Sequence, residues 1–213
     1  MNRLGKIKES ALFTIKFFDL LDFAPKTKEI HRFLFNQKAH LKEVAEALKE
    51  LRGEGLIKNN RERLWYLPSR SMLARSREQK ERVSWVLRRR LKFFGWIFRI
   101  TPYIRTVAIY SNLAFNNASP ESDIDLLVIT RRDRLWISRL IVTLLAFFLG
   151  LKKRRFVKID PGKFCLSFFI TEDHLDLSQL SQKDDLFRAF WMAIILFVLC
   201  MPEHPRRMSS RLF

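Results

Sequence analysis

The sequence predicts an α+β fold in which helices come first and a mixed sheet follows. Apolar residues recur at helical spacing through the first third of the 213-residue chain. Two later runs, Ile124 to Thr130 and Phe164 to Ile170, are apolar and rich in β-branched or aromatic residues, as in buried strands. A strongly basic stretch separates the two regions. We therefore expect a helical domain at 1–68, a basic connecting helix at 69–100 and a sheet domain at 101–213.

The first domain is predicted to contain three helices and a hairpin. Residues 8–20 place their apolar side chains on one helical face, and Thr27 is a candidate N-cap for a helix over 28–35. Residues 41–51 continue with a third amphipathic helix, which glycines end. Short apolar runs on either side of a charged turn then predict a β-hairpin over 56–67. The apolar stripe of the third helix consists of Leu41, Val44, Ala45, Leu48 and Leu51.

This order of elements resembles the winged helix family over residues 8–68. The phrase Leu-Lys-Glu-Leu-Arg-Gly-Glu-Gly-Leu-Ile-Lys at 48–58 is similar to the end of that family's recognition helix and its first wing strand. The resemblance implies DNA binding, with the helix at 41–52 in the major groove and Arg61 and Arg63 on phosphate. Winged helices also dock proteins, and this helix carries acidic as well as basic residues. Both interpretations stay open.

The charge of the chain is its most unusual bulk property. Forty Lys and Arg against 22 Asp and Glu give a net charge of +18, which favours nucleic acid, anionic membranes or polyphosphates. Half of this excess lies in residues 69–105, where 11 basic residues face 2 acidic ones. Aromatic side chains such as Trp85 and Phe94 lie among the cations of the predicted connecting helix. That helix either binds nucleic acid or a membrane surface, or it serves as a connector that packs its aromatic residues on the next domain.

Two acidic side chains stand where the strand at 124–130 begins. Alternate residues of a strand share a face, so Asp123 and Asp125 project together while Ile124 points the other way. Two carboxylates this close repel each other, and a hard divalent cation such as Mg²⁺ relieves the repulsion. The preceding predicted strand, Val107 to Tyr110, leads into a polar turn whose backbone amides can hold phosphate.

These residues together resemble the DNA polymerase beta type nucleotidyltransferase superfamily. The usual pattern in its small enzymes is Gly-Ser-x-Ala-x-Gly, six variable residues, then Asp-Ile-Asp. In this sequence Ser111 takes the place of the first Gly, Asn112 that of the Ser and Asn116 that of the second Gly. Asp123 and Asp125 keep the acidic pair at the same spacing. The spacing is intact, and both glycines are replaced.

The resemblance implies a transferase that moves a nucleoside monophosphate from an NTP to an acceptor. Asp123 and Asp125 would hold Mg²⁺, and Ser111, Asn112 and Asn116 would bind the nucleotide while pyrophosphate leaves in line. The acceptor stays open among protein, RNA and small molecules.

The third carboxylate of the superfamily, which usually lies on a neighbouring strand, has no counterpart in the sequence. The strand at 164–170 offers Ser167 at its centre and no acid; Asp160 lies just before it and Asp173 just after it. Two carboxylates can bind a metal–nucleotide complex without activating an acceptor. The alternative function is therefore a catalytically silent, nucleotide-responsive module that binds nucleic acid through the winged helix and residues 69–100.

The remaining composition favours a cytoplasmic protein without a transmembrane segment. Cys165 and Cys200 lie in apolar runs and are interpreted as buried small hydrophobes, and no histidine has the spacing of a zinc site. Residues 135–151 predict a buried crossover helix, because their charge-free part is too short to span a bilayer. A last apolar helix is predicted from Asp184 or Asp185 to Cys200.

Overall fold

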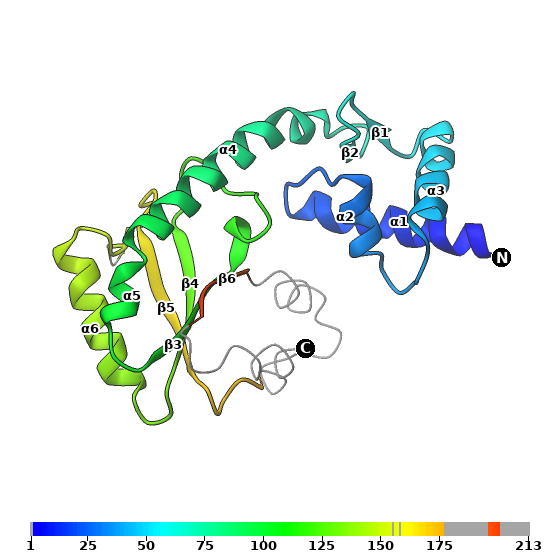
Figure 1. Cartoon of the computed structure of the whole chain (residues 1–213). Coiled ribbons are helices and arrows are strands. Elements are labelled where there is room, and N and C mark those ends of the chain that lie inside the picture. The colour runs from blue at the N-terminus through cyan, green and yellow to red at the C-terminus, as the bar shows by residue number, and fades with distance from the viewer. Residues whose placement is uncertain (1, 155, 158, 177–195, 201–213) are drawn as a thin grey trace. The chain divides into compact units, whose positions relative to one another are not determined.

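A computed structural model of the chain describes residues 2–154, 156–157, 159–176 and 196–200 (Figure 1). It has the α+β composition that the sequence predicts. The chain divides into two compact units, residues 1–79 and 80–213, and the stretch predicted as a connecting helix contributes to both. Within the described part of the chain, no helix is both long enough and apolar enough to cross a lipid bilayer.

The first unit contains three helices and a small antiparallel hairpin. The helices are α1 (Arg3–Leu20), α2 (Thr27–Arg32) and α3 (Leu41–Gly53). The hairpin pairs β1 (Lys58–Asn59) with β2 (Trp65–Tyr66). The predicted helices and hairpin are therefore present, with α1 beginning five residues before the expected position because the Asn2 side chain caps it by accepting from the Gly5 N–H at 2.8 Å.

The predicted stripe of α3 forms much of the core of this unit. Val44, Leu48 and Leu51 are buried among residues of α1, whereas Leu41 stays exposed. The expected N-cap of α2 is wrong by one residue. Lys26 is the cap, and its backbone N–H donates to the Glu29 carboxylate at 2.6 Å. The Thr27 hydroxyl instead accepts a hydrogen bond from the indole of Trp65 at 3.0 Å.

The basic stretch forms two helices where the sequence predicts one. Helix α4 (Ser71–Phe94) ends before Gly95, and the short helix α5 (Trp96–Ile100) follows. Glycine is the weakest helix former after proline, and Gly95 is the one glycine between residues 69 and 100, so the interruption falls where the helix is easiest to break. In the second unit, the inward residues of α4 and α5 join the main hydrophobic core, among them Leu91 and Phe98.

The second unit is built on a four-stranded mixed sheet of order β5-β4-β3-β6. The strands are β3 (Ile104–Ile109), β4 (Ile124–Thr130), β5 (Phe164–Thr171) and β6 (Leu196–Cys200). Strands β4 and β5 run parallel, and β3 runs antiparallel to both of its neighbours. The expectation of a mixed sheet is confirmed.

Strand β6 corrects the prediction for the end of the chain. The helix expected from Asp184 or Asp185 to Cys200 is wrong for residues 196–200, which pair with β3; its earlier part lies outside the described residues. An apolar run without polar alternation fits a buried strand as well as a buried helix. Here the open edge of β3 supplies backbone partners, which a strand satisfies and a helix does not.

Helix α6 (Leu135–Phe148) connects the parallel strands β4 and β5 and lies beside the sheet (Figure 1). Only its inner side is buried, through Ser138, Val142 and Ala146. The prediction of a buried crossover helix is therefore wrong for the opposite side, where Trp136 is 76 % exposed. The sequence does not distinguish the buried side from the exposed side, because α6 is apolar on both.

Candidate metal and nucleotide site

The two predicted carboxylates meet a thiol at the beginning of β4. Asp123 directly precedes the strand, Asp125 lies within it, and Ile124 between them is buried. The parallel register places Cys165 of β5 opposite Asp125. One candidate ligand atom from each of Asp123, Asp125 and Cys165 lies within 4.8 Å of the other two. The structure thus forms a three-residue cluster from two neighbouring strands.

Cys165 corrects the sequence interpretation that made it a buried hydrophobe. It is a free, partly exposed thiol beside the two carboxylates. The neighbouring strand therefore contributes a sulfur atom to the cluster. The β4–β5 register brings Cys165 next to Asp125. The sequence alone does not show this contact, because 39 residues lie between the two. For Cys200 only the backbone is described, in β6.

The electrostatics of the cluster favour the arrival of positive charge. Burial raises the pKa of Asp125, and the neighbouring Asp123 raises it further, while hydrogen bonds from Cys165 and Ser111 act in the opposite direction. Burial also raises the pKa of the Cys165 thiol. Burial together with the charge of Asp125 raises the pKa of Tyr110 to about 12. A cation bound between the carboxylates would offset the cost of their partial burial.

A lysine supplies that positive charge in the protein itself. The ammonium of Lys153 forms an ion pair with the Asp123 carboxylate, and this contact raises the pKa of Lys153. The Lys153 backbone N–H donates to the Phe164 carbonyl at 3.0 Å, which holds the segment after α6 against the start of β5. The sequence pattern does not single out this lysine. Its proximity to Asp123 depends on the crossover, which no local pattern specifies.

The predicted nucleotide loop has a backbone conformation suited to the superfamily's glycines. Ser111 has φ +67° and Asn116 has φ +62°, the two positions at which the pattern has Gly. Residues 111–113 form a 3₁₀ turn, and the Asn117 N–H donates to the Asn112 carbonyl at 2.9 Å. The loop therefore keeps the left-handed residues of the pattern without its glycines.

The loop brings only one of its predicted residues to the carboxylates. The Ser111 side chain forms a hydrogen bond with Asp125. Asn112 and Asn116 lie further along the same loop; Asn112 is exposed and Asn116 is half-buried. Their predicted contacts with a nucleotide stay predictions.

Helix α4 holds this loop at two points within the second unit. The Arg88 guanidinium donates to the carbonyls of Leu113 at 2.8 Å and Ala114 at 3.0 Å. The Ala118 N–H donates to the Ser84 hydroxyl at 3.1 Å in a buried contact. In the sequence Arg88 is one of the 11 basic residues of 69–105. In the structure its guanidinium binds the backbone of the loop.

The other acids near β5 have partners of their own. Asp160 is buried and accepts from the Arg154 backbone N–H at 2.8 Å. Asp173 pairs with Arg132 at 3.5 Å and with His174 at 3.2 Å. Ser167 is exposed, with its hydroxyl 3.3 Å from the Cys165 sulfur. Of these three residues, Ser167 alone is adjacent to the cluster.

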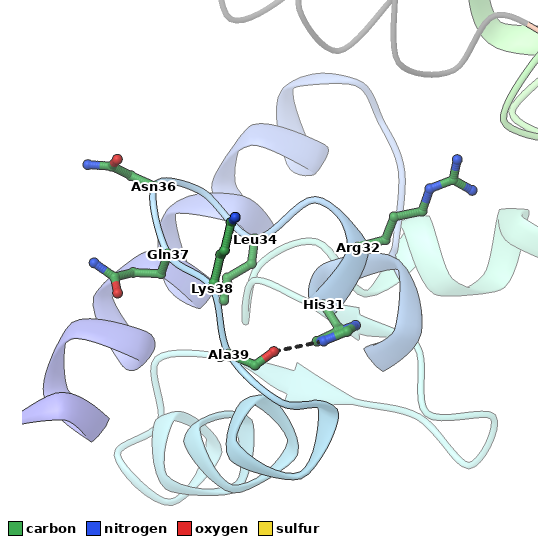
Figure 2. Close-up of a pocket in the computed structure, with 7 residues that line it drawn as sticks. All are labelled: His31, Arg32, Leu34, Asn36, Gln37, Lys38 and Ala39. Carbon is green, nitrogen blue, oxygen red and sulfur yellow. Dashed lines mark hydrogen bonds between the residues drawn. The ribbon is translucent and has the colours of Figure 1, made fainter. Parts of the chain in front are cut away.

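A pocket of about 590 Å³ lies in the first unit, and none of the predicted site residues lines it (Figure 2). Its wall comes from α2 and the loop that follows, and the His31 ring bonds to the Ala39 carbonyl at 2.9 Å. Arg32 and Lys38 contribute cations, and no carboxylate lines it. The pocket offers neither a metal ligand set nor a reactive pair, so the carboxylate cluster remains the stronger candidate. Its lining residues are His31, Arg32, Leu34, Asn36, Gln37, Lys38 and Ala39.

The donor set of the cluster fits a divalent cation. The oxygens of Asp123 and Asp125 suit Mg²⁺, whereas the sulfur of Cys165 suits a softer ion such as Zn²⁺. Both carboxylates lie at the beginning of β4, and Asp125 bonds to Ser111 of the neighbouring turn. No protein-family model, curated protein or solved structure matches this chain.

Proposed function

We propose that the chain is a metal-dependent nucleotidyltransferase of the polymerase beta type, which transfers a nucleoside monophosphate from an NTP to an acceptor. The observation that carries the proposal is the cluster of Asp123, Asp125 and Cys165, with ligand atoms within 4.8 Å of one another. A loop with the left-handed residues of the superfamily pattern lies next to it, and its Ser111 bonds to Asp125.

Each residue of the site has a distinct role in this proposal. Asp123 and Asp125 hold Mg²⁺, which neutralises charge on the triphosphate. Ser111, Asn112 and Asn116 present backbone and side-chain donors to the phosphate oxygens. An acceptor hydroxyl oxygen bonds to the α-phosphorus while the bond from that phosphorus to pyrophosphate breaks, and the hydroxyl proton passes to water.

The positive charge of Lys153 has two partners in this proposal, Asp123 and the triphosphate. In the structure its ammonium pairs with Asp123. With Asp123 engaged as a metal ligand, the Lys153 ammonium would be available to the triphosphate, where a flexible lysine acts as a point charge. The proposal also places the chain in the cytoplasm, where NTPs occur and a free thiol such as Cys165 stays reduced.

Calorimetric titration of metal–nucleotide complexes tests the proposal. The parent protein and Asp125→Ala are titrated with each NTP in the presence of Mg²⁺ or Mn²⁺, with Asp133→Ala as the matched control. Asp133 belongs to the same unit, and its side chain is 86 % exposed and outside the cluster. We expect binding to weaken at least about tenfold in Asp125→Ala, as for the loss of a charged ligand. Equal affinity in parent and Asp125→Ala would contradict the proposal.

A second candidate function is a catalytically silent module that binds nucleic acid in response to nucleotide. Its support is the exposed Trp85 on α4, over whose ring the Arg89 guanidinium lies at 4.7 Å from the centroid. Aromatic and cationic pairs of this kind stack on bases and contact phosphates. The winged-helix-like unit contributes less, because the exposed side of α3 carries Glu46 and Glu50 beside its cations.

Gel shifts with duplex DNA and structured RNA across a salt series test this second function. Binding at low salt that weakens steeply with salt, and weakens further in Arg89→Gln, is expected. No shift at low salt would contradict it, since phosphate contacts by a chain of net charge +18 are strongest there.

A further inference from the structure

The outward side of α6 is an exposed apolar surface within the second unit. Trp136, Leu140, Leu144 and Phe147 recur at helical spacing and are between 45 and 76 % exposed, and Phe148 beside them is 79 % exposed. The buried side of the same helix, at Ser138, Val142 and Ala146, faces the opposite way. An outward helical face normally carries charged or polar residues, so this face is suited to an apolar environment.

The helical segments of the second unit that adjoin this face carry positive charge without acidic residues. Residues 82–100 and 134–155 contain 12 Lys and Arg and no Asp or Glu. They include the second half of α4, all of α5 and α6, and these helices share one hydrophobic core. The exposed members include Arg89, Lys92, Arg99 and Lys152. The same helical layer also exposes Trp96 by 44 %.

We propose that this helical layer docks on an anionic lipid surface, with the outward side of α6 buried at the boundary between headgroups and acyl chains. Exposed leucine and phenylalanine side chains gain by entering hydrocarbon, and the surrounding cations gain by approaching anionic headgroups. A second copy of the chain would oppose like charges across the interface. Nucleic acid needs cations and hydrogen-bond donors, whereas the outward side of α6 offers it apolar side chains.

The dimensions and the aromatic residues of α6 fit a helix lying in the plane of the membrane. Its 14 residues extend about 21 Å, which is short of the roughly 30 Å of a bilayer core. Trp136 is suited to the headgroup level, and the Arg139 guanidinium lies 5.7 Å from the centroid of its ring. The long aliphatic part of such an arginine can cover apolar surface while its charge reaches the headgroups.

Vesicle binding by the full chain tests the proposal. Co-sedimentation is measured with phosphatidylcholine vesicles and with vesicles that also hold about 30 % phosphatidylglycerol, at low and high salt. The test variant is Trp136→Ser/Phe147→Ser/Phe148→Ser. The matched control, Leu20→Ser/Met72→Ser, removes apolar side chains that are 72 and 66 % exposed in the first unit.

We expect the parent and the control to bind the anionic vesicles, with affinity that falls as salt rises. The triple variant should bind at least about tenfold more weakly with an unchanged melting temperature, because its three side chains are exposed. Brominated acyl chains should quench tryptophan fluorescence of the parent, which provides a readout without any substitution. The proposal is independent of the nucleotidyltransferase function, so Asp125→Asn should bind vesicles as the parent does.

Three results would overturn the proposal. The first is equal vesicle binding by the parent and the triple variant, or no binding by the parent at low salt. The second is a parent protein that does not bind vesicles but forms a dimer or binds nucleic acid, with this association lost in the triple variant. That result would assign the outward side of α6 to a second copy or to nucleic acid. The third is a large fall in melting temperature for the triple variant, which would mean that protein covers the face.

Discussion

Replacing Asp125 with asparagine should stabilise the metal-free protein while removing a ligand of the candidate cation. The substitution keeps the shape of the side chain and removes one of two neighbouring charges. Asp125 is partly buried, and both its burial and the charge of Asp123 raise its pKa. A site selected for binding a cation commonly costs stability when the cation is absent. The direction of the effect therefore separates a binding site from a structural carboxylate.

The geometry sets the size of the expected gain. Two unit charges 4.8 Å apart, the largest separation of these oxygens, repel by about 3.5 kcal/mol at an effective dielectric constant near 20 and by about 0.9 kcal/mol in water. The Lys153 ammonium beside Asp123 offsets part of this repulsion. We expect Asp125→Asn to gain about 1 kcal/mol at neutral pH, which raises the melting temperature by about 3 °C.

The pH dependence of this gain follows from the sign of the pKa shift. Because the pKa of Asp125 is raised in the folded protein, its contribution to stability is favourable below its ordinary pKa of 3.8. That contribution is lost as pH rises through the raised value. The advantage of Asp125→Asn is therefore present at pH 7 and disappears at strongly acidic pH.

Thermal unfolding followed by circular dichroism in the presence of EDTA measures the effect, and Asp160→Asn is the matched control. The Arg154 backbone N–H lowers the pKa of Asp160, so its charge stabilises the fold above pH 3.8 and this benefit is lost as pH falls through the lowered value. Asp160→Asn should thus lower the melting temperature at pH 7. A lower melting temperature for Asp125→Asn at pH 7 would refute the reasoning.

Substitutions at three further positions probe the loop and the first unit. Ser111→Gly and Ser111→Ala both lose the hydrogen bond to Asp125, but only glycine relieves about 1–2 kcal/mol of left-handed backbone strain at φ +67°, against about 0.4–1 kcal/mol of chain entropy; urea unfolding should therefore show Ser111→Gly to be the more stable of the two, and the reverse order would contradict the strain. Leu48→Ala empties a fully buried position and should cost the first unit about 2–5 kcal/mol in urea unfolding, whereas a cost below about 1 kcal/mol would show that the site is not close-packed. Arg88→Met removes the donors at 2.8 and 3.0 Å to the Leu113 and Ala114 carbonyls; it should speed amide exchange across the loop and weaken nucleotide binding, and unchanged exchange would show that Arg88 does not hold the loop.

The sequence was most informative where the chemistry of a site is local. The strand at 124–130 and the pairing of Asp123 with Asp125 on one face follow from residues next to each other, and the structure has β4 over those residues. Ser111 and Asn116, the two positions at which the superfamily pattern has glycine, likewise both have a left-handed backbone conformation. Local geometry fixes these features, because side-chain alternation and turn conformation depend on adjacent residues.

The features that sequence reasoning missed all depend on contacts between distant segments. Cys165 joins the cluster through the register of two parallel strands, and Lys153 reaches Asp123 through the crossover that α6 makes. Residues 196–200 form a strand because β3 offers an open edge. The exposure of Trp136 depends on which side of α6 meets the sheet, and an almost wholly apolar helix does not encode that choice in its period.

Transfer of label from NTPs labelled at the α-phosphate tests the proposed activity most directly. The parent and Asp125→Asn are incubated with each NTP and Mg²⁺ or Mn²⁺, together with RNA, the chain itself or small hydroxyl compounds as acceptors. Metal-dependent transfer of label with release of pyrophosphate by the parent, and loss of both in a folded Asp125→Asn, is the expected result. Transfer that is equal in the two proteins, or nucleotide binding that never leads to transfer with any acceptor, would contradict the activity and favour the silent module.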